Sequence, residues 1–132
     1  MIISEIRGKY FKMAQHNETG KKGEQLAVEL LISKGYTIRH TNWRSQYLEV
    51  DIIATKNNLL VFIEVKSRNT LYFGNPEEFV SKKKEKNLIN AAEIYVTENQ
   101  LDLEVRFDLI SIIFLETETK IEHIEDAFFS EL

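Results

Sequence analysis

The chain has 132 residues, of which 43% are hydrophobic and 29% are charged, and this composition suits one globular domain. It contains no cysteine, which excludes disulfides and thiolate metal sites. No apolar run approaches the roughly 20 residues that a membrane span needs. The N-terminal segment lacks the apolar centre of a signal peptide. We therefore expect a cytoplasmic protein that has no membrane partner.

Charge is distributed unevenly along the chain. Fifteen of the 17 Lys and Arg residues lie within residues 1–92, whereas 11 of the 21 Asp and Glu residues lie within residues 93–132. A basic first part with an acidic second part fits a protein that turns one face to a polyanion. It fits equally well a solvated surface whose charges happen to be segregated.

The first predicted element is a helix over residues 21–34, preceded by an N-terminal tail or short helix over residues 1–18. Residues 19–132 are expected to form a single domain. Gly35 lies where a left-handed helix cap belongs. The segment 37–45 reads as a strand or an irregular link. One apolar stripe at helical spacing indicates the helix: Leu26, Ala27, Leu30 and Leu31.

Two strands are predicted over residues 48–55 and 59–67, joined by a turn at Asn57-Asn58, since Asn tolerates the positive φ of hairpin turns. A loop over residues 69–75 precedes the second helix. Asn75-Pro76-Glu77-Glu78 predicts the start of this helix, which then runs to about Val96. Strands over residues 105–116 and 120–124 complete an α/β fold, a mixed sheet flanked by helices in the order α-β-β-α-β-β.

The hairpin carries charged residues at positions where burial would make an ionised side chain unfavourable. A two-residue turn places Asp51 opposite Glu64 and Glu49 opposite Lys66, so that all four side chains project from one face. Glu64 also follows the apolar run 59–63, and a buried carboxylate there needs a compensating charge. Mg²⁺, which takes one or two carboxylates and keeps waters, would supply it. The alternative is a set of plain cross-strand ion pairs at a wet sheet edge.

Two residues of the predicted helices support the same charged site. Glu24 lies in line with Ala27 and Leu31, which turns its carboxylate toward the sheet. The alternative for each helix residue is a long side chain that passes the apolar stripe to reach water. Lys84 lies on the apolar stripe of the second helix, with Val80, Leu88, Ala91 and Tyr95.

The order of these residues, a helical Glu followed by Asp-x₁₂-Glu-x-Lys on a hairpin, resembles the PD-(D/E)XK nuclease superfamily of restriction enzymes and Holliday-junction resolvases. The chain is similar in particular to the YraN-type family of bacterial endonuclease-like proteins. Leu48 stands where that family usually has Gly, and Val50 where the superfamily name has Pro. The similar segments are GKKGEQLAVELLISKGY, NWRSQYLEVDIIA, VFIEVKSR, VSKKKEKNLINAA, RFDLI and IEHIEDAF, which together cover about residues 20–128.

The resemblance implies a restriction-endonuclease-like fold and a role for each matching residue. Asp51 and Glu64 would bind Mg²⁺ or Mn²⁺, with the Val65 carbonyl as a third ligand. Lys66 would orient the attacking water or stabilise the developing charge, and Glu24 would complete the metal shell through water. Lys84 would contact the scissile or a neighbouring phosphate. Apart from the resemblance, Arg44 and Arg68 flank the proposed site and are candidates to bind phosphates, although each fits a plain surface charge equally well.

The resulting prediction is a divalent-metal-dependent nuclease that hydrolyses phosphodiester bonds in DNA, with junctions or flaps as candidate substrates. Resolvase-like chemistry on two strands would favour a homodimer. Two alternatives stay open: a non-catalytic nucleic-acid-binding protein with the nuclease fold, and a protein-interaction adaptor.

Other polar and aromatic residues receive structural roles. His16, His40 and His123 share no ligand spacing, which argues against zinc, and His123 is expected at a sheet end. Arg106 and Asp108 are expected to form a structural pair. Core packing is favoured over base stacking for Trp43 and Tyr47.

Overall fold

A computed structural model describes residues 2–69 and 80–128, with side chains for residues 18–69 and 80–128. The fold is mixed α/β, as predicted. None of the described helices is long and apolar enough to cross a membrane. The elements are α1 (Ile2–Ser33), β1 (Thr37–Ser45), β2 (Leu48–Lys56), β3 (Leu59–Arg68), α2 (Lys82–Asn99), β4 (Glu104–Phe114) and β5 (Thr119–Ile124).

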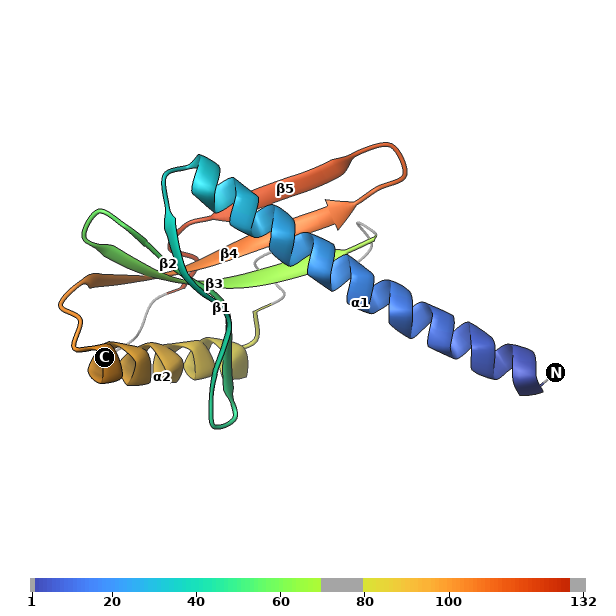
Figure 1. Cartoon of the computed structure of the whole chain (residues 1–132), viewed down its shortest axis with the longest axis horizontal. Helices are drawn as coiled ribbons and strands as arrows, with labels where there is room; N and C mark the ends of the chain where they lie inside the picture. The colour runs from blue at the N-terminus through green and yellow to red at the C-terminus, as the bar shows by residue number, and fades with distance from the viewer. Residues whose placement is uncertain (1, 70–79, 129–132) are drawn as a thin grey trace.

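The five strands form one sheet in the order β1-β2-β3-β4-β5 (Figure 1). Only β3 and β4 are parallel, and the chain between them contains α2, because parallel neighbours need a crossover connection. Residues 37–45, which were predicted as either a strand or an irregular link, form strand β1. The sheet therefore has one strand more than the expected order.

The helices cover opposite faces of the sheet, and β3 shows this by its alternation. Leu60 and Phe62 pack in the cluster that contains α2, whereas Val61 and Ile63 pack in the cluster that contains α1. Because successive strand side chains point to opposite faces, the apolar run of β3 is buried on both sides. A charged residue that follows this run lies next to the centre of the protein.

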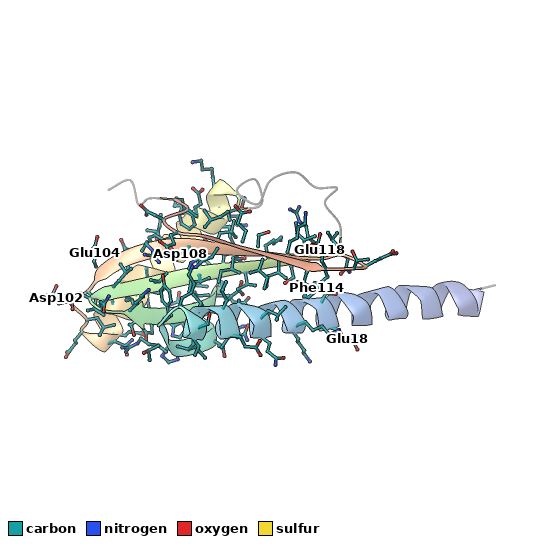
Figure 2. All side chains as sticks on the ribbon, turned by 90° about the horizontal axis from the view of Figure 1, so that it is seen from above. Glu18, Asp102, Glu104, Asp108, Phe114 and Glu118 are labelled. Atoms are coloured by element: carbon teal, nitrogen blue, oxygen red, sulfur yellow. The ribbon has the colours of Figure 1, made fainter. Side chains whose placement is uncertain are left out.

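Helix α1 ends as predicted, at a left-handed glycine. Gly35 has φ +91°, and the Tyr36 N–H donates to the Leu31 carbonyl at 3.0 Å. This bond satisfies a carbonyl that the helix end would otherwise leave without a partner. At its other end α1 begins at Ile2, so the segment predicted as tail or short helix is helical. That part of α1 extends well beyond the sheet (Figures 1 and 2).

Helix α2 begins later than the sequence predicted. Its N-cap is Ser81, whose backbone is extended and whose Oγ accepts a hydrogen bond from the Lys84 N–H at 3.1 Å. A helix that ran from Asn75-Pro76 to Val96 would include Ser81, but the Ser81 backbone is extended, so the prediction of one continuous helix is wrong. The predicted start itself lies within residues 70–79, outside the described residues. The helix ends at Asn99, beyond the predicted Val96, with Gln100 in the left-handed conformation.

Asp108 on β4 is the centre of a structural network, as expected for its pairing with Arg106. Both oxygens accept hydrogen bonds from Arg106 at 2.8 Å, and His123 Nε2 lies 2.7 Å from Oδ2. The Asp126 N–H donates to Oδ1 at 3.0 Å. Burial would raise the pKa of Asp108, but the hydrogen bonds from His123 and Arg106 outweigh it, and the pKa is lowered. The network ties β4 to β5 and the turn that follows.

The outer nitrogen of His123 also has a partner, since Lys34 Nζ lies 2.7 Å from Nδ1. An ammonium can only donate, so Nδ1 accepts and Nε2 carries the proton given to Asp108. His123 is thus a structural residue at the end of the sheet, as predicted. Figure 2 places Asp108 along β4 between Glu104 at one end and Phe114 at the other.

Candidate metal centre

The site begins where β2 and β3 separate. Their pairing runs from Lys56↔Leu59 to Ile52↔Ile63, which is the register that the two-residue turn predicts. The pairing ends there, one residue before Asp51 on β2 and Glu64 on β3. Both carboxylates therefore lie at the point where the two strands cease to share hydrogen bonds.

Asp51 occupies the gap between the diverging strands. Its Oδ2 accepts a hydrogen bond from the main-chain N–H of Val65 at 2.8 Å and so takes the place of a β2 carbonyl as the acceptor. The N–H and the carbonyl of one strand residue point to the same side of the strand. The Val65 carbonyl therefore faces the same gap as the Asp51 carboxylate, as a metal ligand at this position requires.

Glu64 is almost enclosed, with 9% of its surface exposed. Lys84 on α2 places Nζ 3.3 Å from Oε1, which confirms that this lysine points toward the sheet. The other oxygen, Oε2, is buried and has no hydrogen-bond partner within the described part of the chain. A buried acceptor without a donor is unfavourable by about 1–3 kcal/mol, and a bound cation would remove that penalty.

Both carboxyl groups have a raised pKa. Burial is the largest cause for Glu64, the negative charge of Asp51 adds to it, and Lys84 and Lys66 oppose it; the pKa rises from 4.5 to about 7. Burial also raises the pKa of Asp51, against the hydrogen bond from the Val65 N–H. Burial thus disfavours the charged form of both groups, and the nearby lysines do not offset this effect.

Glu24 reaches the site from α1, as the helical stripe predicted. It is half-buried, and its negative charge contributes to the raised pKa of Asp51. The Asn42 side chain on β1 donates to Glu24 Oε2 at 3.2 Å. Helix, β1 and β2 thus converge on one acidic cluster.

Gly23, which no spacing rule in the sequence identifies, allows α1 to lie close to β3. A Cβ at this position would overlap Ser67 Oγ and lie 2.9 Å from Ser67 Cβ on β3. Only a residue without a side chain permits this contact. The glycine therefore sets the height of Glu24 above the split strands.

Lys66 is exposed, two residues beyond Glu64 on β3, and its charge acts to lower the pKa of Glu64. Glu49 does not face it. Glu49 pairs across the other ladder with Arg44, with 3.4 Å between the charged atoms, so the predicted alignment of four charges on one face is wrong for Glu49. Lys66 forms no ion pair with Asp51 or Glu49 among the described side chains, which speaks against the alternative of plain cross-strand pairs.

The predicted nucleic-acid contacts lie around this cluster. The Arg44 side chain is 72% exposed on the β1–β2 hairpin, and Arg68 is half-buried at the end of β3. Trp43 packs on the core edge-to-face with Tyr95, as expected. Tyr47 is 75% exposed at the hairpin tip, so its predicted core packing is wrong.

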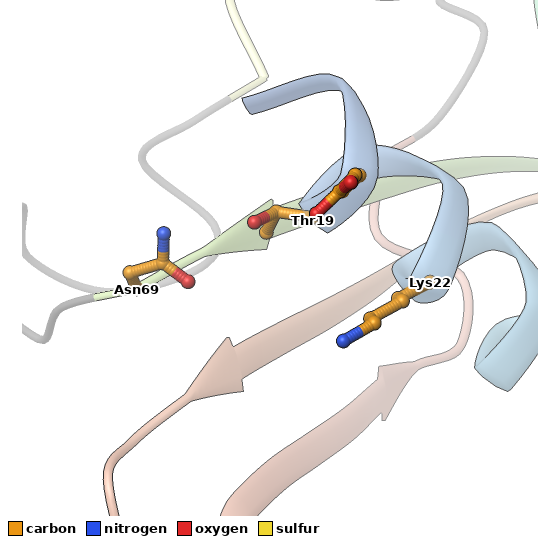
Figure 3. Close-up of a pocket in the computed structure, with 4 residues that line it drawn as sticks. Thr19, Lys22 and Asn69 are labelled. Carbon is orange, nitrogen blue, oxygen red and sulfur yellow. The ribbon is translucent and has the colours of Figure 1, made fainter. Parts of the chain in front are cut away.

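Two surface pockets lie along α1, and Glu24 lines one of them. One, of about 440 Å³, lies between α1 and β1, and the other, of about 240 Å³, lies toward the end of β3. Figure 3 shows Thr19, Lys22 and Asn69 around the second. The first is lined by Lys21, Glu24, Gln25, Val28, Glu29, Thr41 and Asn42. Of the acidic cluster, Glu24 thus borders the pocket between α1 and β1.

The donor set fits a hard divalent cation with an incomplete protein shell. Within the described residues, no three His, Cys, Asp or Glu side chains are arranged as a full metal site. Asp51 and Glu64 nevertheless occupy facing positions where β2 and β3 separate, next to Val65, and Glu64 Oε2 has no hydrogen-bond partner among the described residues. Mg²⁺ is typically held by one or two carboxylates with several waters, so these donors are sufficient.

Comparison with known proteins adds a family to this geometry. Residues 23–112 match the family described as "Uncharacterised protein family UPF0102". The chain belongs to this family. The match begins at Gly23 and includes Glu24, Asp51, Glu64, Lys66 and Lys84, which confirms the YraN-type resemblance at the level of the family.

Individual relatives agree over most of the chain. A UPF0102 protein of Christiangramia forsetii is 56% identical over 117 residues, which is 89% of this chain and 98% of that protein. A UPF0102 protein of Flavobacterium psychrophilum is 52% identical over the same shares. One of Bacteroides thetaiotaomicron is 47% identical, over 91% of this chain and 99% of its own length. These names state a family and no activity.

Proposed function

We propose that this UPF0102 protein is a divalent-metal-dependent nuclease of the PD-(D/E)XK type that hydrolyses phosphodiester bonds in DNA. The observation that carries the proposal is the meeting of Asp51 and Glu64 at the split between β2 and β3. Both carboxyls have raised pKa values, and one Glu64 oxygen is buried without a hydrogen-bond partner among the residues that the structure describes. Such an arrangement is unfavourable for folding alone and is typical of a site that holds a cation.

The residues that would hold Mg²⁺ or Mn²⁺ are Asp51, Glu64 and, through its carbonyl, Val65. Glu24, held by Asn42, is placed to bind a water of the same shell. A divalent ion supplies polarisation of a phosphoryl oxygen and a lower pKa for its bound water. The protein supplies the fixed geometry, through the Val65 N–H bond that orients Asp51.

Two lysines would supply the positive charge that binds a phosphate at the site. Lys66 extends from β3 beside Glu64, where its ammonium can orient the attacking water and stabilise negative charge that develops on the phosphorus oxygens. Lys84, from the first turn of α2, is placed to contact the same or a neighbouring phosphate. Arg44 and Arg68 would bind the backbone farther away.

Junctions and flaps are the substrates that the resolvase-like resemblance favours within this proposal. Cleavage of two strands would need two such sites, which a homodimer supplies.

Cleavage of labelled DNA in Mn²⁺ tests the proposal. The panel holds a four-way junction, a flap, a duplex and a single strand, incubated with wild type and with Glu64→Ala from the same purification. Glu98→Ala, an exposed change on α2, is the matched control. We expect wild type and Glu98→Ala to cut, and Glu64→Ala to lose about 100-fold or more, in line with the loss of a metal ligand.

Two results would contradict the proposal. Equal cutting by wild type and Glu64→Ala would indicate a contaminating nuclease. Salt-sensitive binding of DNA without cutting would favour the non-catalytic binding protein instead.

A further inference from the structure

Asn42 interrupts strand β1 at the level of the site. Its φ is +52°, in the left-handed region that residues other than Gly seldom adopt, although Asn tolerates it better than most. The neighbouring pairs are Thr41↔Ile52 and Trp43↔Val50, and this register places Asn42 opposite Asp51. The unusual backbone thus lies beside a candidate metal ligand, where strained conformations tend to be functional.

Strand β2 changes phase at the same level. Val50 packs in the cluster on the α2 side, and Ile52 in the cluster on the α1 side. Residues two apart on a regular strand share a face, so β2 turns over at Asp51. A left-handed residue directly opposite accounts for this turn, because it changes the direction of β1 by a local backbone rotation. The turned pair opens the gap that the Asp51 carboxylate occupies.

From this position the Asn42 side chain forms a hydrogen bond with Glu24 on α1. Its Nδ2 donates to Glu24 Oε2 at 3.2 Å and so joins β1 to α1. Both residues line the 440 Å³ cavity between α1 and β1. Glu24 would otherwise turn away from Asp51, because the two carboxylates repel each other.

We infer that Asn42 is a positioning residue that holds the Glu24 carboxylate against Asp51, so that a water-bridged divalent cation can bind between them. The inference rests on the proposed function, since it assigns Asn42 a role in the same metal site. Asn42 acts through Glu24 and contacts neither the cation nor the substrate. It thus contributes both a backbone conformation that splits the strands and an amide that orients an acid.

The experiment is a double-mutant cycle with Mn²⁺ affinity, measured by calorimetry, as the readout. Asn42→Gly keeps the left-handed backbone and removes only the amide. Asn57→Gly is the matched control, because Asn57 has φ +55° in the β2–β3 turn, away from the site. Glu24→Ala and the double variant with Asn42→Gly complete the cycle, and circular dichroism checks folding.

We expect Asn42→Gly to weaken Mn²⁺ binding about 10-fold or more, the usual effect of losing a group that orients a metal ligand. Asn57→Gly should bind as wild type does. The double variant should bind no worse than Glu24→Ala alone, because the amide acts only through Glu24. If Asn42→Gly does not fold, Asn42→Ala, which removes the amide without adding a charge, replaces it in the cycle and should again couple to Glu24→Ala.

The experiment distinguishes failure of the proposed function from failure of the inference about Asn42. A wild type that binds no Mn²⁺ would overturn the proposed function and this inference together. Wild-type affinity in Asn42→Gly would overturn the inference alone, as would additive effects in the cycle, because Asn42 would then act without Glu24.

Discussion

The ammonium of Lys84 lies 3.3 Å from a carboxylate oxygen of Glu64, and this ion pair joins α2 to β3 across the edge of the core. One lysine faces a cluster in which Glu24, Asp51 and Glu64 each contribute a carboxylate. Burial raises the pKa of Glu64 to about 7 in spite of Lys84 and Lys66, so the two lysines do not offset the cost of burying this charge. The site is therefore built at the expense of stability, as functional sites often are.

Replacing Glu64 with Gln should stabilise the protein, and more so at higher pH. The folded-state pKa of about 7 exceeds the ordinary 4.5, so the folded protein binds the extra proton between these values. The free energy of unfolding of wild type therefore falls as pH rises from about 4.5 through 7, and Glu64→Gln lacks this loss. We expect a gain of about 1–3 kcal/mol at pH 8 and almost none near pH 4.5.

Urea unfolding at several pH values measures this difference. Glu49→Gln serves as the control, because Glu49 is exposed and pairs with Arg44 on the outer hairpin. A Glu64→Gln variant that is less stable than wild type at pH 8 would show that the Lys84 ion pair outweighs the burial of the charge.

Two substitutions of Asp51 should separate its structural role from its chemical one. Asp51→Asn keeps an oxygen that can accept from the Val65 N–H, whereas Asp51→Ala leaves that N–H without its partner. We expect Asp51→Ala to be about 1–3 kcal/mol less stable than Asp51→Asn in urea unfolding. Both should lose Mn²⁺-dependent cleavage, because an amide oxygen is a poor substitute for a charged ligand. Cleavage by Asp51→Asn at the wild-type rate would exclude Asp51 as a metal ligand.

Much of this site was predictable because it depends on regular spacing. A two-residue turn fixes the register of β2 and β3, and that register brings Asp51 and Glu64 together. The helical repeat of α1 and α2 likewise turns Glu24 and Lys84 toward the sheet. In each case a local rule determines the direction of the side chain.

The features that were missed depend on contacts between distant segments. Gly23 matters only because Ser67 lies against it, and Asn42 only because β1 bends beside Asp51. Strand β1 itself was ambiguous because it is an edge strand whose side chains are mostly exposed, so it lacks clear apolar alternation. The start of α2 was misplaced because Asn75-Pro76 and Ser81 both satisfy helix-start chemistry.

Adding a methyl group at Gly23 should damage both packing and the site. The new Cβ would lie 2.9 Å from Ser67 Cβ, so α1 must move away from β3 and carry Glu24 with it. Gly20→Ala is the matched control, because nothing lies within 4 Å of its added Cβ in the same helix. We expect Gly23→Ala to lose about 1–3 kcal/mol of stability and Gly20→Ala to gain about 0.5–1 kcal/mol.

Mn²⁺ affinity gives the second readout for this pair. Gly23→Ala should bind Mn²⁺ more weakly than wild type, while Gly20→Ala should be unchanged. If Gly23→Ala were destabilised but bound Mn²⁺ normally, the close approach of α1 would serve packing alone and would not set the position of Glu24.

Asp108→Asn should be strongly destabilising without any effect on the metal site. Asp108 is fully buried and accepts from Arg106, His123 and the Asp126 N–H, so its loss leaves the Arg106 charge without its main partner. Breaking a buried pair in this way costs about 3–5 kcal/mol. Asp102→Asn, at an exposed position, is the control and should stay within about 0.5 kcal/mol of wild type.

The pH dependence of this effect has the opposite sign to that of Glu64. The pKa of Asp108 is lowered from 3.8 in the folded state, so its contribution is present above about pH 3.8 and is lost as pH falls through the folded value. The difference in unfolding free energy between wild type and Asp108→Asn should therefore be full at pH 7 and shrink in acid. A difference that stayed constant down to pH 2 would mean that shape, and not the charge of Asp108, holds β4 and β5 together.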